Sequence, residues 1–303
     1  KQPSETLEIW NKEAILGDVV RTIRKFKPDV IINRFDHRTP GSTHGHHTSS
    51  AMLSFEAFDL ANNANAYPEQ LKNTSTWQPK RLFFNTSWWF YGSEEKFKEA
   101  DKSNMLHMDV GTYYPMLGMS NNEIASLASS QHLCQGFGRL TSRGTEDEYV
   151  ELLKGDLPND KSNLFDGIDT SWSRIDGGKA IGEILYDVQE NFNFKNPTTH
   201  IPALLEAYQL LQKSTDEHWK ELKTDEITTI IASISGLYLE ASTMSPYTNA
   251  GEVVDVQIQV LNRSDIDIKL NSLFLNEQSI NIGNVVLNNN KSLEKKVKLT
   301  IPT

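Results

Sequence analysis

The sequence predicts an α/β fold that is followed by a β-sandwich-like segment, and three observations support this prediction. A helical pattern of apolar residues leads into the short apolar run 29–33, which is typical of a buried parallel strand. After Gly251, apolar and polar residues alternate between turns rich in Asn and Ser, as in antiparallel strands. The 303 residues include 38% hydrophobic residues, so the chain can bury one large core or two unequal ones.

The first predicted element is an amphipathic helix that starts after Ser4 and ends at Pro28. Four apolar side chains recur at helical spacing along it: Ile15, Val19, Ile23 and Phe26. A helix that feeds a buried strand indicates an α/β layer. The polar stretch 34–50 follows the strand, and a second helix is expected after it. On that helix five side chains would share one face: His44, His47, Ala51, Phe55 and Phe58.

Further strands are expected at 79–84 and, more weakly, at 107–110. Ser120 and Glu123 have the spacing of a capping box, which predicts the start of a helix. The stretch 138–178 is polar and irregular, and helical patterns then recur at 180–191, 201–213 and 225–235. We therefore expect three parts, with limits at 1–150, 151–245 and 246–303.

Composition excludes several classes of protein. The net charge of −10 argues against nucleic-acid binding, which needs clustered Lys and Arg. No run of about 18 apolar residues occurs, so no membrane span is expected. The single cysteine, Cys134, rules out an internal disulfide framework and a Cys-rich zinc site.

The densest group of chemically active residues is a histidine loop after the first predicted strand, with His44, His46 and His47 within four residues. In an open α/β sheet, ligands bind at the carboxyl ends of strands, where this loop would lie. Imidazole is a good zinc ligand, but catalytic zinc usually has three protein ligands and one open position. Asp36 and His37 are close enough in sequence to contribute. The alternative is a solvent-exposed loop without function.

Three ordered blocks of sequence carry a resemblance to a known family: KPDVIINRFDHRTPGSTHGHHTSSA, MDVGTYYPMLGMSNNEIASLASSQHLCQGFGR and LFDGIDTSWSRIDGG. They resemble the PIG-L/LmbE-like N-acetylglucosaminyl deacetylases, in the long secreted bacterial branch of that family. The resemblance implies a Rossmann-like layer with a helical extension and a periplasmic or secreted location.

The resemblance also implies roles for single residues. His47 matches the family's zinc-ligating histidine, and His44 matches the histidine that polarises the amide oxygen. Asp36 matches the acidic residue that is expected to orient His44. His46 stands where the family usually has an acidic residue. Three further side chains are candidates for the substrate pocket or for support of the ligands: Arg34, and His132 and Gln135 in a His-x-x-Gln ending.

One part of the family pattern is not found. The Ala-His-Pro-Asp-Asp loop, which supplies the other metal ligands and the general base, does not occur in the sequence. The resemblance implies that it precedes Lys1 or belongs to a partner polypeptide. When complete, such an enzyme uses Zn²⁺ or another divalent metal to remove the acetyl group from an N-acetylated amino sugar. The alternative is a non-catalytic carbohydrate-binding or scaffold protein, in which Trp77, Trp88 and Trp89 stack on sugars or pack in a core or interface.

Overall fold

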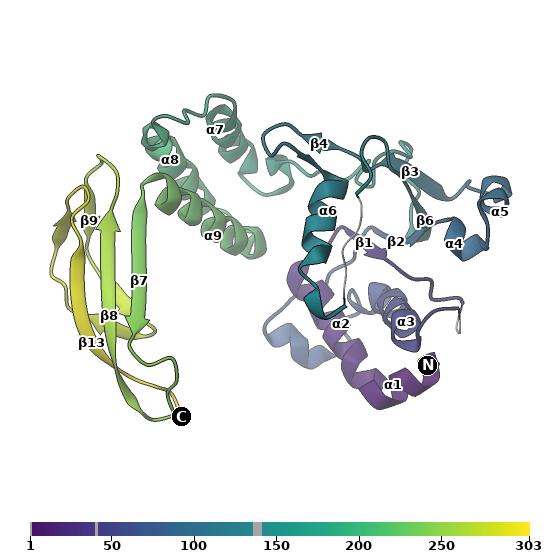
Figure 1. The fold of residues 1–303 in the computed structure, drawn as a ribbon, viewed down its shortest axis with the longest axis horizontal. Helices are drawn as coiled ribbons and strands as arrows, with labels where there is room; N and C mark the ends of the chain where they lie inside the picture. Colours follow the sequence, from purple (N-terminus) through teal and green to yellow (C-terminus); the bar gives the residue numbers. More distant parts are fainter. Residues whose placement is uncertain (1, 40–41, 136–140) are drawn as a thin grey trace. The chain divides into compact units, whose positions relative to one another are not determined.

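A computed structural model describes residues 2–39, 42–135 and 141–303 of the chain. The chain divides into two compact units, Lys1–Ile168 and Asp169–Thr303, and each is described by itself. Both mixed α/β structure and a separate antiparallel sheet are present, as the sequence predicts. Figure 1 shows the elements along the chain.

The first unit contains a four-stranded mixed sheet in the order β1-β2-β6-β3. Strand β1 (Val30–Asn33) runs parallel to β2 (Arg81–Thr86), whereas β6 (Asp147–Gly155) is antiparallel both to β2 and to β3 (Met105–Asp109). The three strands predicted near 29–33, 79–84 and 107–110 are thus confirmed within a few residues. Because β1 and β2 are parallel, α3 between them completes a βαβ unit.

Strand β6 lies within a stretch that the sequence presents as irregular, so that prediction was wrong. Its central position holds Glu151, a buried carboxylate, beside the buried Val150. A charged residue in the middle breaks the apolar pattern by which a buried strand is recognised. The buried carboxylate of Glu151 has an ion partner inside the unit, Arg38.

Three helices, α1 (Pro3–Trp10), α2 (Lys12–Phe26) and α3 (Gly45–Leu60), pack together below β1 and β2 in Figure 1. The single helix expected after Ser4 is broken at Asn11, whose φ of 57° lies in the left-handed region that Asn tolerates. The buried face also differs from the prediction, since Phe26 is exposed. The core between the helices is formed by Leu16, Val20, Ile23, Leu53, Ala57 and Ala61.

Arg24 is a fully buried residue of α2 that binds the segment after α3. Arg24 donates hydrogen bonds of 2.8–3.4 Å to the side chain of Gln70 and to five main-chain carbonyl oxygens, those of Leu60, Ala61, Asn63, Ala66 and Tyr67. Burial lowers the pKa of Arg24, and Glu69 opposes the shift. The segment that leads to η1 (Pro68–Lys72) is therefore held by Arg24. Its Nε, Nη1 and Nη2 all donate to oxygen atoms of the protein.

The remaining elements of the first unit are short. They are α4 (Trp88–Tyr91), α5 (Glu94–Glu99), β4 (Tyr113–Tyr114), β5 (Met119–Ser120), α6 (Asn121–Ser130) and η2 (Leu133–Gln135). The capping box is confirmed, because Ser120 Oγ accepts from the N–H of Glu123 while the Glu123 carboxylate accepts from the N–H of Ser120.

The second unit begins with helices and continues as a β structure. Its helical elements are η3 (Trp172–Arg174), α7 (Gly178–Glu190), η4 (Pro197–His200), α8 (Ile201–Leu211) and α9 (Glu217–Ile234). The three helical patterns of the sequence correspond to α7, α8 and α9, although α9 starts earlier than expected. Their shared core includes Ile181, Leu204, Leu211 and Ile227.

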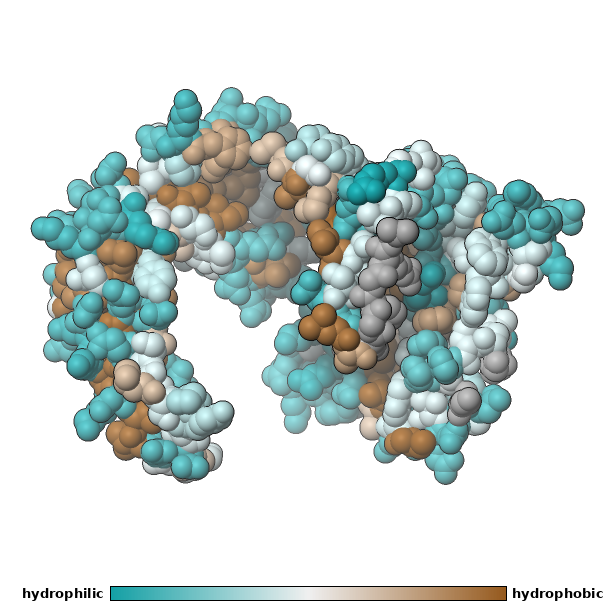
Figure 2. Space-filling view, in the orientation of Figure 1, coloured by the Kyte–Doolittle hydropathy of each residue, from teal (hydrophilic) through white to brown (hydrophobic). Residues whose placement is uncertain are grey.

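The β structure has a three-stranded antiparallel sheet in the order β13-β8-β7, formed by β7 (Leu237–Thr243), β8 (Val253–Asn262) and β13 (Leu293–Thr300). Two antiparallel pairs accompany it, β9 (Ile268–Leu270) with β12 (Val285–Leu287) and β10 (Leu273–Leu275) with β11 (Gln278–Ile280). Alternate residues of β8 enter one core, and hydrophobic residues lie between hydrophilic ones on the face shown in Figure 2.

The limits of the units differ from those expected. Residue 150 falls inside β6, and the first unit continues to Ile168. Residue 245 lies after β7, which pairs with β8 and so is joined to the antiparallel sheet. Within the described residues, none of the helices combines the length and apolar character that a membrane crossing requires.

Candidate functional site

The histidine loop leads from β1 into the first turn of α3. His44 is the N-cap residue, with extended backbone angles (φ −64°, ψ 143°), and its carbonyl oxygen accepts from the N–H groups of His47 (3.0 Å) and Thr48 (3.3 Å). The hydroxyl groups of Thr43 and Thr48 lie 3.0 Å apart and join the loop to the helix. The loop therefore sits at the carboxyl end of a parallel strand pair and at a helix N-terminus, two places where proteins bind ligands.

The three imidazole rings form one cluster. The ring centroid of His46 lies 4.2 Å from that of His47, and His44 lies 5.5 Å from His46 and 5.4 Å from His47. His47 is half-buried and stacks on Phe35 with 4.0 Å between centroids and 8° between planes. Burial first, and then the neighbouring His46 and His44, lower the pKa of His47. A lowered pKa favours the neutral form of imidazole, which is the form that binds metals.

The donors of this cluster fit a divalent metal in kind but not in number. Neutral imidazole nitrogen is a usual zinc ligand. In residues 2–39, 42–135 and 141–303, however, no three His, Cys, Asp or Glu side chains are arranged to hold a metal ion. A complete catalytic zinc site would need ligands beyond those that the described residues bring together.

Asp36 takes part in a different contact from the one expected. Its Oδ1 accepts hydrogen bonds from the main-chain N–H of Arg38 (2.9 Å) and from Nε of Arg38 (2.9 Å), and it lies 3.5 Å from Nδ1 of His37. No contact with His44 is found among the described residues. The Arg38 side chain folds back over the carboxylate and forms an ion pair with it, and the orientation of His44 by Asp36 stays a prediction.

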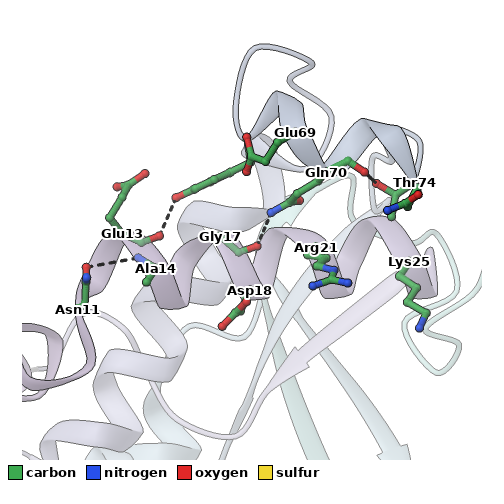
Figure 3. Close-up of a pocket in the computed structure, with 12 residues that line it drawn as sticks. Asn11, Glu13, Ala14, Gly17, Asp18, Arg21, Lys25, Glu69, Gln70 and Thr74 are labelled. Carbon is green, nitrogen blue, oxygen red and sulfur yellow. Dashed lines mark hydrogen bonds between the residues drawn. The ribbon is translucent and has the colours of Figure 1, made fainter. Parts of the chain in front are cut away.

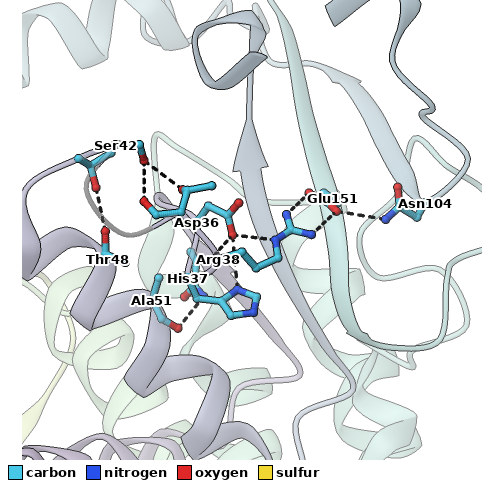
Figure 4. A network of polar contacts seen from close by, with 11 residues as sticks. Asp36, His37, Arg38, Ser42, Thr48, Ala51, Asn104 and Glu151 are labelled. Atoms are coloured by element: carbon cyan, nitrogen blue, oxygen red, sulfur yellow. Dashed lines mark hydrogen bonds and ion pairs between the residues drawn. The ribbon is translucent and has the colours of Figure 1, made fainter. Parts of the chain in front are cut away.

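Arg38 links Asp36 to β6. Its Nη1 and Nη2 donate to Oε1 (2.9 Å) and Oε2 (2.6 Å) of Glu151, and Asn104 Nδ2 donates to Oε1 of Glu151 at 3.3 Å (Figure 4). The hydrogen bonds to Glu151 are the main cause of the raised pKa of Arg38. Sequence reasoning missed Arg38 and Glu151, which lie 113 positions apart. No local pattern indicates this pair, because Glu151 lies in a stretch that the sequence presents as irregular.

His37 lies against the same network. Its ring stacks on Phe55 with 4.2 Å between centroids. Burial lowers the pKa of His37, and the charge of Asp36 opposes this shift.

The other candidate residues are not all brought together. Arg34 is exposed, and its Nη1 donates to Oδ1 of Asn85 at 2.6 Å. His46 belongs to the imidazole cluster. His132 is exposed in the turn after α6, where its N–H donates to the carbonyl of Ser129. Gln135 ends η2, and its side chain lies outside the described part of the chain.

A wider groove of about 750 Å³ lies elsewhere on the first unit, between α2 and η1. Figure 3 shows the hydrogen bond from Gln70 Nε2 to the main-chain oxygen of Gly17 (2.8 Å). The hydroxyl of Tyr67, which also lines the groove, donates to the main-chain oxygen of Glu13 (3.2 Å). The groove shares no lining residue with the histidine loop. Size alone therefore does not indicate the functional site.

Comparisons with known protein families, with curated proteins and with solved structures find no match for this chain. The likeness to the deacetylase family thus depends on the sequence blocks alone, and the function is a matter for proposal.

Proposed function

We propose that the chain carries part of the active site of a metal-dependent N-deacetylase that acts on an N-acetylated, N-acetylglucosamine-type sugar. The observation that carries the proposal is the cluster of His44, His46 and His47 at the start of α3, next to the carboxyl end of β1. The βαβ unit around it supports a Rossmann-like layer of the deacetylase type.

His47 is the proposed metal ligand. Its lowered pKa favours the neutral ring, which has a lone pair for a cation, and its ring stacks on Phe35. Zn²⁺ or another divalent metal, when bound, would activate a water molecule and polarise the acetamido carbonyl. The further ligands would come from beyond the described residues.

His44 is the proposed hydrogen-bond donor to the acetamido oxygen. As an exposed N-cap residue it precedes the first free N–H groups of α3, where the helix dipole favours negative charge. A developing oxyanion placed there would be stabilised both by the imidazole and by the helix terminus. The resemblance would then place the protein in the periplasm or outside the cell.

The test uses the intact protein and measures its metal content and the release of acetate from N-acetylglucosamine. His47→Ala should lower the zinc content, whereas His44→Ala should keep zinc and lose turnover by about 10²–10³-fold, as expected for one oxyanion donor. His107→Ala is the control, because His107 is an exposed histidine on β3 that pairs with Asp147.

Equal loss of zinc in both loop variants would show that the two roles are wrongly assigned. An intact protein that binds no metal and releases no acetate would exclude the enzyme. The non-catalytic carbohydrate-binding protein would then be favoured if N-acetylglucosamine still binds.

A further inference from the structure

The antiparallel sheet of the second unit has two edge strands, β13 and β7, because its order is β13-β8-β7 (Figure 1). An edge strand presents N–H and C=O groups that can pair with another chain. Strand β7 pairs with β8 along all 7 of its residues, Leu237–Thr243. In the described part of the chain no strand pairs with the other side of β7, so this side is open within the second unit.

The two edges differ in their protection against pairing. Strand β13 carries Lys295, Lys296 and Lys298. Lys295 lies opposite the buried Ile258, so its charged side chain is on the core side of the sheet. Lysines and inward-pointing charges are features that keep an edge strand from pairing with other chains. Strand β7 has the sequence LYLEAST, with Glu240 as its one charged residue and without lysine or proline. The sheet is therefore protected at β13 and able to pair at β7.

The core side of β7 is uncovered. Leu239 lies opposite Val260, and Ala241 lies opposite Ile258. Directly opposite residues of an antiparallel pair point to the same face of the sheet. Val260 and Ile258 are 2% and 3% exposed, whereas Leu239 is 58% exposed and Ala241 is exposed as well. The apolar face of the sheet therefore extends beyond its own core to the open edge, where a further strand with apolar residues on that face would bury Leu239.

Strand β7 is complementary to itself in one antiparallel register. A two-fold axis through such a pair places one residue opposite its own copy. With the axis at Leu239, this residue faces its copy and Leu237 faces Ala241, so the core side of the pair is apolar throughout. With the axis at Glu240, two carboxylates would lie opposite each other, which is unfavourable. The register centred on Leu239 is therefore the favoured one.

The charges on the other face of the sheet fit the same register. The axis at Leu239 places Tyr238 of one copy opposite Glu240 of the second. The guanidinium of Arg263 lies over the ring of Tyr238, 5.5 Å from its centroid. Each Glu240 would thus approach a cation of the other copy, and within the described residues neither Glu240 nor Arg263 forms an ion pair. This complementarity is to a second copy of the same strand.

We propose that the chain forms a two-fold symmetric dimer in which β7 of one copy pairs antiparallel with β7 of the other, with Leu239 at the axis. The two three-stranded sheets then form one continuous sheet, and each Leu239 is buried against its copy. The proposal concerns the second unit and does not depend on the proposed function.

The first experiment measures the mass of the full chain by analytical ultracentrifugation over a range of concentrations. We expect a reversible monomer–dimer equilibrium with a dissociation constant of about 1–100 µM, because one pair of strands buries less area than the roughly 1,200–2,000 Å² of a stable interface. A protein that stays monomeric up to about 500 µM would overturn the proposal and favour a different partner for β7.

Two exposed apolar residues of the second unit provide a matched pair of variants. Leu239→Lys should weaken the dimer at least about tenfold, because it places two like charges at the axis. Phe274, on β10, is 61% exposed and so resembles Leu239, but it lies on a different strand. Phe274→Lys should leave the dissociation constant unchanged. Circular dichroism of both variants checks that the monomer is folded. Equal weakening by the two substitutions in folded protein would overturn the proposal.

A second experiment tests the register by disulfide cross-linking. Cys134, which is exposed, is first replaced by serine so that it cannot cross-link. In that background Leu239→Cys should give a disulfide-linked dimer on mild oxidation, because opposite Cβ atoms lie about 4.5–5.5 Å apart. Ala241→Cys is the control on the same face of β7. Its two copies would be four residues out of register, about 13 Å apart at about 3.3 Å per residue, and should not cross-link. Equal cross-linking of both variants, or cross-linking of Ala241→Cys alone, would overturn the proposal.

Discussion

Replacement of Arg38 by methionine tests whether the network with Asp36 and Glu151 holds the first unit together. The variant keeps most of the side-chain length and removes the guanidinium. Both carboxylate partners are about nine-tenths buried, with 9% and 11% of their side chains exposed. Without Arg38 they would be left near each other, with no cation hydrogen-bonded to either among the described residues.

The expected loss of stability in Arg38→Met follows from the burial of the two carboxylates, Asp36 and Glu151. Removing one partner of a buried ion pair costs about 3–5 kcal/mol. The Arg38 side chain is 46% exposed, so water screens part of the interaction, and we reduce the expected loss to about 2–3 kcal/mol. Since the pKa of Arg38 is raised in the folded state, its contribution is complete below the usual arginine pKa of about 12.5. The loss should therefore persist throughout the neutral pH range.

The assay is urea unfolding of the intact protein at pH 7. The quantity measured is the free energy of the unfolding transition of the first unit. Arg143→Met is the control, because Arg143 pairs with Glu123 at 2.8 Å while 68% of its side chain is exposed. That variant should lose less than about 1 kcal/mol. If both variants lose the same stability, or if Arg38→Met loses less than about 1 kcal/mol, burial of the carboxylates does not control stability as we argue.

Three further predictions concern other buried groups. Thr86→Val should raise the free energy of unfolding by about 1 kcal/mol without ligand, since it removes an unpaired buried hydroxyl; a loss of stability in urea unfolding would contradict this. Arg24→Met should lower stability by more than about 3 kcal/mol, because several buried carbonyl oxygens lose their donor, and unchanged proteolysis of residues 61–74 would argue against it. The lowered pKa values of His37 and His47 mean that the unfolded chain binds more protons below about pH 6.5, so stability should fall from pH 7 to pH 5. His47→Asn should reduce that fall, as measured by the urea midpoint at each pH, and an identical pH profile in the variant would refute the assignment.

Local sequence patterns predicted the secondary structure correctly where residues close together in the chain determine it. The strand at 30–33, the helix after His44 and the capping box of Ser120 and Glu123 all follow from residues within a few positions of each other. The alternating pattern of β8 likewise predicts its buried face.

Sequence patterns did not predict the structure where contacts between residues far apart in the chain determine it. Glu151 is buried in β6 and pairs with Arg38, and no local periodicity of the sequence indicates a partner 113 positions away. Asn11 breaks the first helix through its own backbone angles, which apolar spacing does not report. The histidines of the candidate site were found as a cluster, but the partner of Asp36 was not, since it depends on the path of the Arg38 side chain.

The place of β6 in the sheet has a consequence for synthesis of the protein. Strand β6 lies between β2 and β3, although it follows both in the chain. Roughly 60 residues separate the end of β2 from the start of β6, so at about 5–20 residues per second a ribosome takes roughly 3–12 s to supply it. During that interval the edge of β2 lacks β6, and Nη1 and Nη2 of Arg38 lack the carboxylate of Glu151. The nascent chain therefore passes through a stage in which the unpaired edge of β2 is exposed. At that stage a chaperone or another chain can bind to the edge.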